Sequence, residues 1–189
     1  MKKTALILGA TLLFALGTWG SKYLYGVFDE VTPEAVAAEK RPVPAIQGSN
    51  PVRPLFALPD MDGVSRNIKG WDGKVLVINF WATWCPPCLR EMPAFIDLQK
   101  KYGPQGLQFV GVAFDDVEAI QGFLKSSKMR INYPILVGED DAMVIAEQYG
   151  NAMGVLPYTV IVDRKGRVVY GQMGEMSRSL AEQTIKPLL

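Results

Sequence analysis

From residue 54 onwards, hydrophobic residues form short β-branched runs that alternate with stripes at helical spacing. Two near-continuous apolar runs, 75–80 and 107–114, have the pattern of central strands that are covered on both faces. Shorter apolar runs at 133–137, 158–162 and 168–171 predict three further strands. The pattern therefore predicts a sheet whose strands are separated mainly by helices.

The first predicted helix directly follows the first central strand. Pro86 and Pro87 can occupy its first turn, where a missing N–H group costs little. Its apolar stripe consists of Leu89, Met92, Phe95, Ile96 and Leu98. Pro93 lies inside the stripe and is expected to kink the helix, because proline removes a backbone donor.

Aspartates mark the predicted starts of the next two helices. Asp115 or Asp116 is expected to cap a helix over 117–126, since a carboxylate can accept from the free N–H groups of a first turn. Asp140 or Asp141 is expected to cap the following helix in the same way.

The two ends of this region complete the predicted fold. Short strand candidates at 55–58 and 64–68 flank a turn sequence at 59–63, so we expect an N-terminal β-hairpin. Residues 179–189 suggest a final helix. The order of elements predicts an α/β protein, a three-layer α/β/α sandwich around a mixed sheet.

The first 28 residues have a different pattern. Lys2 and Lys3 precede an uncharged, largely apolar run over 4–21, which is close to the minimum length that spans a bilayer. We predict that residues 1–28 form an uncleaved membrane anchor, with the lysines on the cytoplasmic side. A cleaved secretory signal and a buried core helix are the alternatives.

The anchor is followed by a predicted linker. Residues 29–53 contain four prolines and the polar stretch 47–50 but no sustained apolar period, so we expect a semi-extended tether. We assign residues 54–189 to one domain. With 189 residues, 49% of them hydrophobic, the chain is long enough for a domain with its own core and an anchor.

Composition excludes several kinds of chemistry. The formal net charge of +1 gives no reason to expect nucleic acid or an acidic substrate. The chain contains no histidine, which excludes histidine metal sites and Ser-His or Cys-His catalysis. Acid–base chemistry must therefore use carboxylates, thiols, lysine, tyrosine or water.

The only two cysteines, Cys85 and Cys88, flank Pro86 and Pro87 where the first central strand is followed by a helix. Such a pair can cycle between dithiol and disulfide, form an inert staple, or bind a metal. A disulfide across so short a loop constrains the unfolded chain very little, and a two-cysteine metal site needs further ligands. The redox role is therefore the leading hypothesis.

The helix N-terminus suits this redox role. It stabilises a thiolate, and the thiolate is the nucleophile in disulfide exchange. Cys85 lies at the edge of the predicted helix, so we expect it to be the exposed attacking residue. Cys88 lies on the same side and is expected to resolve the mixed disulfide.

The segment 79–88, Asn-Phe-Trp-Ala-Thr-Trp-Cys-Pro-Pro-Cys, resembles the active-site segment of the thioredoxin superfamily, and Pro93 matches that family's helix-kinking proline. The anchor, the hairpin and the sequence over 88–93 resemble the TlpA-type branch of membrane-anchored thiol–disulfide oxidoreductases, which includes cytochrome c maturation thioredoxins. The similarity extends from about Val52 to the C-terminus. It implies a thioredoxin-like fold with a central strand–helix insertion over 133–150.

The resemblance also implies roles for four residues. Pro157 matches the family's cis-proline, which lies against the cysteine pair, and the backbone of Leu156 would then offer a strand edge to substrate. Glu91 matches a glutamate that tunes the thiols. Asn79 replaces the buried aspartate of cytoplasmic thioredoxins and cannot titrate. An ordinary trans proline and a solvated glutamate are the alternatives for Pro157 and Glu91.

Residues beside the cysteines are candidates for substrate binding. Trp84, Pro86 and Pro87 surround the thiols in sequence and are expected, with Leu156 and Pro157, to contact substrate. Trp81 is expected to be a packing residue. Packing alone is the alternative for Trp84.

These observations favour a thiol–disulfide oxidoreductase with Cys85, Cys88 and Glu91 as its catalytic residues. The resemblance implies a single-pass protein of the inner (cytoplasmic) membrane whose domain faces the periplasm. It implies reduction of partner disulfides, in apocytochrome c or a copper-centre assembly protein, and recharging by a membrane electron donor of the thiol-relay type. We expect no metal, no cofactor and no nucleic acid.

Two other functions stay open on the sequence. One is a peroxiredoxin-like thiol peroxidase, for which Thr83 and Arg90 offer only a loose match and the Cys-x-x-Cys spacing is unsuitable. The other is a non-catalytic copper carrier of similar fold, although such carriers use a wider cysteine spacing and a distant histidine.

Overall fold

The computed structural model describes residues 51–189. The predicted anchor over 1–28 and the part of the predicted linker before residue 51 lie outside the described residues. The described chain begins with a two-stranded antiparallel hairpin, β1 (Ala57–Pro59) and β2 (Ser65–Asn67), followed by the 3-10 helix η1 (Ile68–Trp71). The hairpin predicted from the turn sequence is therefore confirmed.

A five-stranded mixed sheet forms the centre of the domain, with the strand order β5-β4-β3-β6-β7. Strands β3, β4 and β5 are parallel, whereas β6 pairs antiparallel with both β3 and β7. The bounds are β3 (Val75–Trp81), β4 (Leu107–Ala113), β5 (Ile135–Val137), β6 (Tyr158–Val162) and β7 (Val168–Met173). All seven residues of β3 are buried, as its continuous apolar run predicts.

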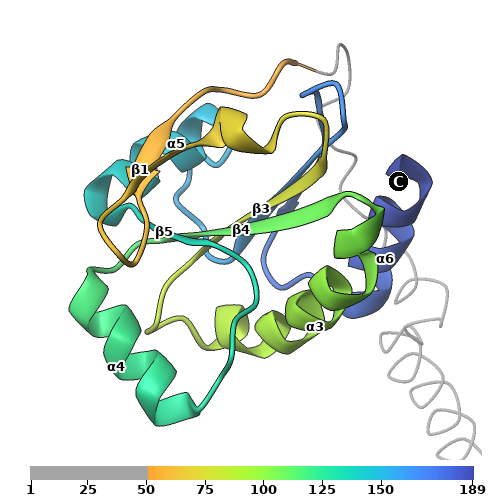
Figure 1. The fold of residues 1–189 in the computed structure, drawn as a ribbon. Helices are drawn as coiled ribbons and strands as arrows, with labels where there is room; N and C mark the ends of the chain where they lie inside the picture. Colours follow the sequence, from red (N-terminus) through yellow and green to blue (C-terminus); the bar gives the residue numbers. More distant parts are fainter. Residues whose placement is uncertain (1–50) are drawn as a thin grey trace, which may run out of the picture. The chain divides into compact units, whose positions relative to one another are not determined.

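Helices cover both faces of the sheet (Figure 1). On one face lie α3 (Pro86–Tyr102), α4 (Val117–Ser127) and α6 (Arg178–Ile185), the last followed by the 3-10 helix η3 (Lys186–Leu188). On the other face lie α5 (Glu139–Gln148) and the β1–β2 hairpin. These layers confirm the predicted thioredoxin-like α/β/α sandwich with its hairpin and its inserted strand and helix, β5 and α5.

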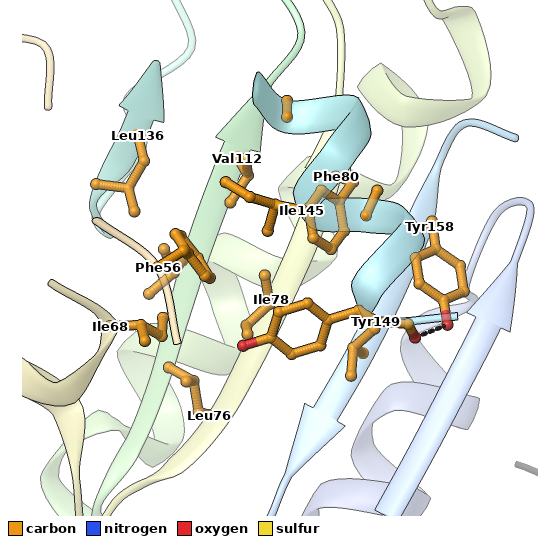
Figure 2. Packing of buried hydrophobic residues seen from close by; sticks show 14 of the residues in the cluster. Phe56, Ile68, Leu76, Ile78, Phe80, Val112, Leu136, Ile145, Tyr149 and Tyr158 are labelled. Atoms are coloured by element: carbon orange, nitrogen blue, oxygen red, sulfur yellow. Dashed lines mark hydrogen bonds between the residues drawn. The ribbon is translucent and has the colours of Figure 1, made fainter. Parts of the chain in front are cut away.

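Alternation along β3 assigns its side chains to the two cores. Leu76, Ile78 and Phe80 point to the face covered by α5 and the hairpin (Figure 2). Phe80 packs there against Tyr149, with ring centroids 6.1 Å apart, and stacks on Tyr158 at 6.0 Å. The Tyr158 hydroxyl donates to the carbonyl of Tyr149 at 2.7 Å, so this buried polar group is satisfied.

The remaining β3 side chains point to the face of α3, α4 and α6. Val75 and Val77 pack there with the buried side of α3. Trp81 lies nearer the start of α3 and is fully buried, which confirms its predicted packing role. Asn79 is the polar member of this row, and its position brings an amide under the helix that carries the cysteines.

One predicted cap is confirmed and one is wrong. Asp116 caps α4 by accepting from the Ala119 N–H at 2.7 Å. The N-cap of α5 is Gly138, with no side-chain cap, and the aspartates expected to cap it lie inside the first turn. The reason is steric, because a Cβ at Gly138 would lie 2.7 Å from that of Ala142. First-turn carboxylates still favour the helix through its dipole.

The predicted linker extends to residue 53, but residues 51–53 are already attached to the domain. Val52 bridges Arg167, and the Arg53 N–H donates to Gly166 at 2.8 Å. The Arg53 side chain is buried and pairs with Asp72. Residues 51–53 are therefore fixed to the turn between β6 and β7. Within residues 51–189, no helix has the length and apolar character needed to cross a bilayer.

Candidate active site

Cys85 and Cys88 are joined as a disulfide at the start of α3. Cys85 is the N-cap of the helix, and Pro86 and Pro87 fill its first two positions. Neither proline has an N–H group, so the Cys88 N–H is the first helix donor, and it reaches Cys85 Sγ at 3.3 Å. In the reduced state, the same donor and the helix dipole would stabilise a thiolate at Cys85.

The dithiol is more buried than the sequence suggested. Cys85 is 4% exposed and Cys88 is fully buried. Both belong to an apolar cluster with Trp81 and Met92, against which Leu156 packs. The expectation of an exposed attacking cysteine is therefore wrong in degree, because this cluster surrounds the helix start. The relative exposure of the two cysteines is as expected, since only Cys85 retains an accessible edge.

A cis peptide bond joins Leu156 to Pro157, as the resemblance implied. The bond comes directly before β6, and β6 pairs with β3 so that Tyr158 lies opposite Phe80. The start of β6 therefore lies next to the end of β3 from which the cysteine loop departs. Within the described chain, the Leu156 N–H and C=O have no backbone partner. They are free to pair with an added strand.

The residues around the cysteines differ strongly in exposure. Trp84 is 67% exposed, so the alternative that it only packs is wrong. Pro86 is exposed and Pro87 is half-buried. The Thr83 N–H donates to Asp115 at 2.6 Å, and this bond holds the loop that leads to Cys85. An exposed aromatic and a proline therefore border the accessible edge of the disulfide.

Glu91 is buried, with 2% of its surface exposed, so a solvated helix glutamate is excluded. Its carboxylate accepts from Asn79 Nδ2 at 2.7 Å and from the Met176 N–H at 2.8 Å. Burial raises the pKa of the Glu91 carboxyl to about 7, the two hydrogen bonds oppose the rise, and the nearby Glu175 carboxylate adds to it. A group with this pKa can take up or release a proton near neutral pH.

Asn79 and Thr159 position this carboxyl group. Asn79 Nδ2 donates to Thr159 Oγ1 at 3.0 Å as well as to Glu91, and all three side chains are buried. Thr159 and the Met176 N–H were missed by the sequence analysis. A threonine in the otherwise apolar run 158–162 was the available signal for Thr159, whereas a backbone donor such as that of Met176 leaves no trace in the sequence.

The residues that suggested a peroxidase are engaged elsewhere. The Arg90 guanidinium binds Glu175 through Nε at 2.9 Å and Nη2 at 2.6 Å, and both side chains are exposed. The hydrogen bonds and ion pairs of residues 51–189 include none between Arg90 and Cys85. The same residues contain no cluster of three or more Cys, Asp or Glu side chains able to hold a metal ion.

A disulfide-bonded cysteine pair that starts a helix, a neighbouring cis-proline and a mixed five-stranded sheet define a thiol–disulfide oxidoreductase of the thioredoxin fold. The model of the Redoxin family matches residues 39–188. The chain belongs to the Redoxin family, and within the thioredoxin superfamily to its TlpA/ResA type.

Known relatives agree with this assignment. The thiol-disulfide oxidoreductase ResA of Bacillus cereus is 27% identical over 190 aligned residues, which cover 100% of this chain and 99% of that protein. ResA of Halalkalibacterium halodurans is 32% identical over 136 residues, covering 70% and 74% of the two chains. A Chlorobium tepidum protein designated a thiol:disulfide interchange protein DsbE has a similar structure, with a TM-score of 0.67 and 26% identity, covering 75% of this chain and 97% of that one.

Proposed function

We propose that this protein is a membrane-anchored reductant of protein disulfides outside the cytoplasm. The observation that carries the proposal is the asymmetry of the cysteine pair. Cys85 has the accessible edge and the helix donor on its sulfur, whereas Cys88 is fully buried beneath it. This arrangement suits one attacking and one resolving thiol.

The exchange then proceeds in two steps. The Cys85 thiolate attacks one sulfur of a partner disulfide, forming a mixed disulfide and releasing the partner's other sulfur as a thiolate. The Cys88 thiolate next attacks Cys85 Sγ, which closes the internal disulfide and releases the second partner sulfur. Two electrons pass to the partner, and the protein is left in the disulfide form.

Glu91 is proposed to handle the proton of Cys88. Cys88 must lose its proton before it can attack, and no histidine is available to accept it. Glu91 lies three residues further along the same helix, on a neighbouring position of its surface. Its raised pKa places it close to the working pH of a neutral compartment.

Substrate is proposed to bind at the residues that border the accessible edge of the disulfide. The free backbone groups of Leu156 would pair with an extended segment of the partner, as in strand addition. Trp84 and Pro86 would cover the apolar side chains of that segment, while Pro87 and Pro157 shape the base of the site. The chemistry of such a site fits a cysteine-containing segment in an unfolded or flexible protein.

The N-terminal pattern supports placement in the inner membrane with the domain on the periplasmic or extracytoplasmic side. The alignment with Bacillus cereus ResA includes this N-terminal region. A reductant in an oxidising compartment needs a membrane electron donor to return it to the dithiol form. Apocytochrome c and a copper-centre assembly protein are the proposed classes of substrate.

The test combines a measurement of the reduction potential of the cysteine pair with a trapping experiment. We expect the Cys85–Cys88 pair of the full chain to have a reduction potential near or below about −230 mV, in the range of reductants. Cys88→Ser should accumulate mixed disulfides with partner proteins, and Cys85→Ser, the matched control, should accumulate none. A potential near about −120 mV would reverse the proposed direction. Normal turnover by the Cys88 variant would overturn the assigned roles.

A further inference from the structure

The segment between β7 and α6 is bound to α3 at two consecutive positions. Arg90 donates to the Glu175 carboxylate through Nε at 2.9 Å and through Nη2 at 2.6 Å. The next residue of the helix, Glu91, accepts from the next residue of the segment, through the Met176 N–H at 2.8 Å. The first of these contacts is exposed and the second is buried. Two neighbouring pairs therefore join the same two stretches of chain, one at the surface and one inside.

The peptide group between Glu175 and Met176 makes the two contacts depend on each other. A peptide group is planar and includes the Cα atoms of both residues, so the positions of these atoms determine where the Met176 N–H points. The Met176 side chain is buried in the core and fixes one Cα. Within residues 51–189, the hydrogen bonds that hold Glu175 are those from Arg90. The ion pair therefore fixes the other Cα.

The residues on either side of this peptide group are attached to other parts of the site. The Gly174 N–H donates at 2.8 Å to the carbonyl of Pro157, the residue of the cis bond. Ser177 caps α6 by accepting from the Leu180 N–H at 3.2 Å. The segment therefore links the start of β6 to α6, and between these two points it is held to α3.

We propose that Arg90 and Glu175 are positioning residues that hold the Met176 N–H on the Glu91 carboxylate. A hydrogen bond to the ionised form of a carboxyl group favours that form, so the Met176 bond limits how far burial raises the pKa of Glu91. Glu175 thus acts in two opposite ways. Its charge disfavours ionisation of Glu91, whereas its bond to Arg90 maintains a donor that favours ionisation.

The charged and titratable groups around Glu91 come from three parts of the chain. On α3 itself, Arg90 is the adjacent residue, and the two cysteines are joined as a disulfide that does not titrate. Glu175 lies in the segment before α6, and Tyr133 lies before β5. Burial raises the pKa of the Tyr133 hydroxyl far above its usual range, so this hydroxyl stays protonated. The contacts from β3 and β6 are uncharged. No other group therefore titrates beside Glu91 near neutral pH.

The opposite effects of Glu175 provide a test that depends on a sign. Glu175→Ala removes a like charge, which by charge alone lowers the pKa of Glu91. The same variant frees the peptide group, and the loss of the Met176 bond raises that pKa. An exposed charge contributes less than a hydrogen bond to a carboxylate, so we expect a net rise of about half a unit to one unit. Arg90→Ala should raise the pKa at least as much, because the Glu175 charge remains without its partner.

The pKa is followed by NMR of carboxyl-labelled glutamate in the disulfide form of the full chain in mild detergent, with Glu91→Gln to assign the signal. The second readout is the rate at which the Met176 amide hydrogen exchanges with solvent. It should rise by at least about tenfold in Glu175→Ala and in Arg90→Ala, because the N–H loses its fixed acceptor. Asp97→Ala is the matched control. It removes the other exposed ion pair between α3 and α6, from Arg178 Nη1 to Asp97 at 2.8 Å, and should change neither readout.

Any of three results overturns the inference: a Glu91 pKa that Glu175→Ala lowers or leaves unchanged, a Met176 amide that exchanges at the parental rate in both variants, or equal effects in Asp97→Ala. The importance of this arrangement for thiol exchange rests on the proposed function, in which Glu91 accepts the proton of Cys88. The disulfide form carries out no exchange, however, so these measurements decide the positioning role separately. Failure of the trapping experiment would disprove the function and leave the positioning role untouched.

Discussion

Replacement of Glu91 by glutamine should change how the stability of the domain depends on pH. The Glu91 carboxyl is buried, and burial raises its pKa from 4.5 to about 7. Because the folded value lies above the unfolded one, the contribution of Glu91 to stability is fully present below about pH 4.5. It is lost as the pH rises through about 7. Glutamine has no charge to bury at any pH.

The size of the effect follows from the pKa shift. One pKa unit corresponds to about 1.36 kcal/mol, so a rise from 4.5 to about 7 corresponds to roughly 3 kcal/mol. Relative to Glu91→Gln, the parent protein should therefore lose roughly 3 kcal/mol of unfolding free energy between pH 4 and pH 8. The variant will carry a constant cost, because its amide nitrogen must face one of two donors, Asn79 Nδ2 or the Met176 N–H. That cost cancels when the two pH curves are compared.

The assay is chemical denaturation of the disulfide form at a series of pH values, so that no thiol titrates. Glu118→Gln is the matched control, since Glu118 is an exposed glutamate on α4, and its curve should parallel that of the parent. Parallel curves for the parent and Glu91→Gln would refute the reasoning. They would mean that folding does not raise the pKa of Glu91.

Two further predictions concern Gly138 at the start of α5 and Asp115 beside the cysteine loop. Gly138→Ala should destabilise the domain by about 1–3 kcal/mol, since its Cβ would lie 2.7 Å from that of Ala142. Gly122→Ala is the paired control on α4. It meets nothing within 4 Å and should stabilise by roughly 0.5–1 kcal/mol, so equal signs in thermal denaturation would contradict the packing argument. Asp115→Ala should cost about 1–3 kcal/mol, because the Thr83 N–H loses its acceptor; an unchanged denaturation midpoint would show that this bond is dispensable.

The sequence predicted the fold well where the patterns were local. The continuous apolar run of β3 and the alternating strands and helices led to the correct layers. Asp116 was among the predicted caps because a side-chain cap depends on neighbours in the chain. The start of α5 was wrong because Gly138 is required there by contact with Ala142, and a glycine in the sequence does not reveal a steric contact.

The candidate site was predicted in its chemistry but not in its environment. The cysteine pair could be recognised from its spacing, and the cis bond before Pro157 from the resemblance. The burial of Cys85 and Glu91 could not, because it depends on side chains contributed by other elements. The bond from Met176 to Glu91 joins residues 85 positions apart and depends on how the segment before α6 is placed.

The attachment of residues 51–53 to the β6–β7 turn places the entry of the described chain far from the dithiol. That turn lies at the Val75 end of β3, whereas the cysteine loop leaves from the Trp81 end (Figure 1). The seven residues of β3, at about 3.3 Å each, separate the two ends by roughly 20 Å. The point where the described chain joins the sheet and the reactive cysteine loop are therefore at opposite ends of the central strand. Residues 51–53 consequently leave the cysteine end of the sheet clear of the incoming chain.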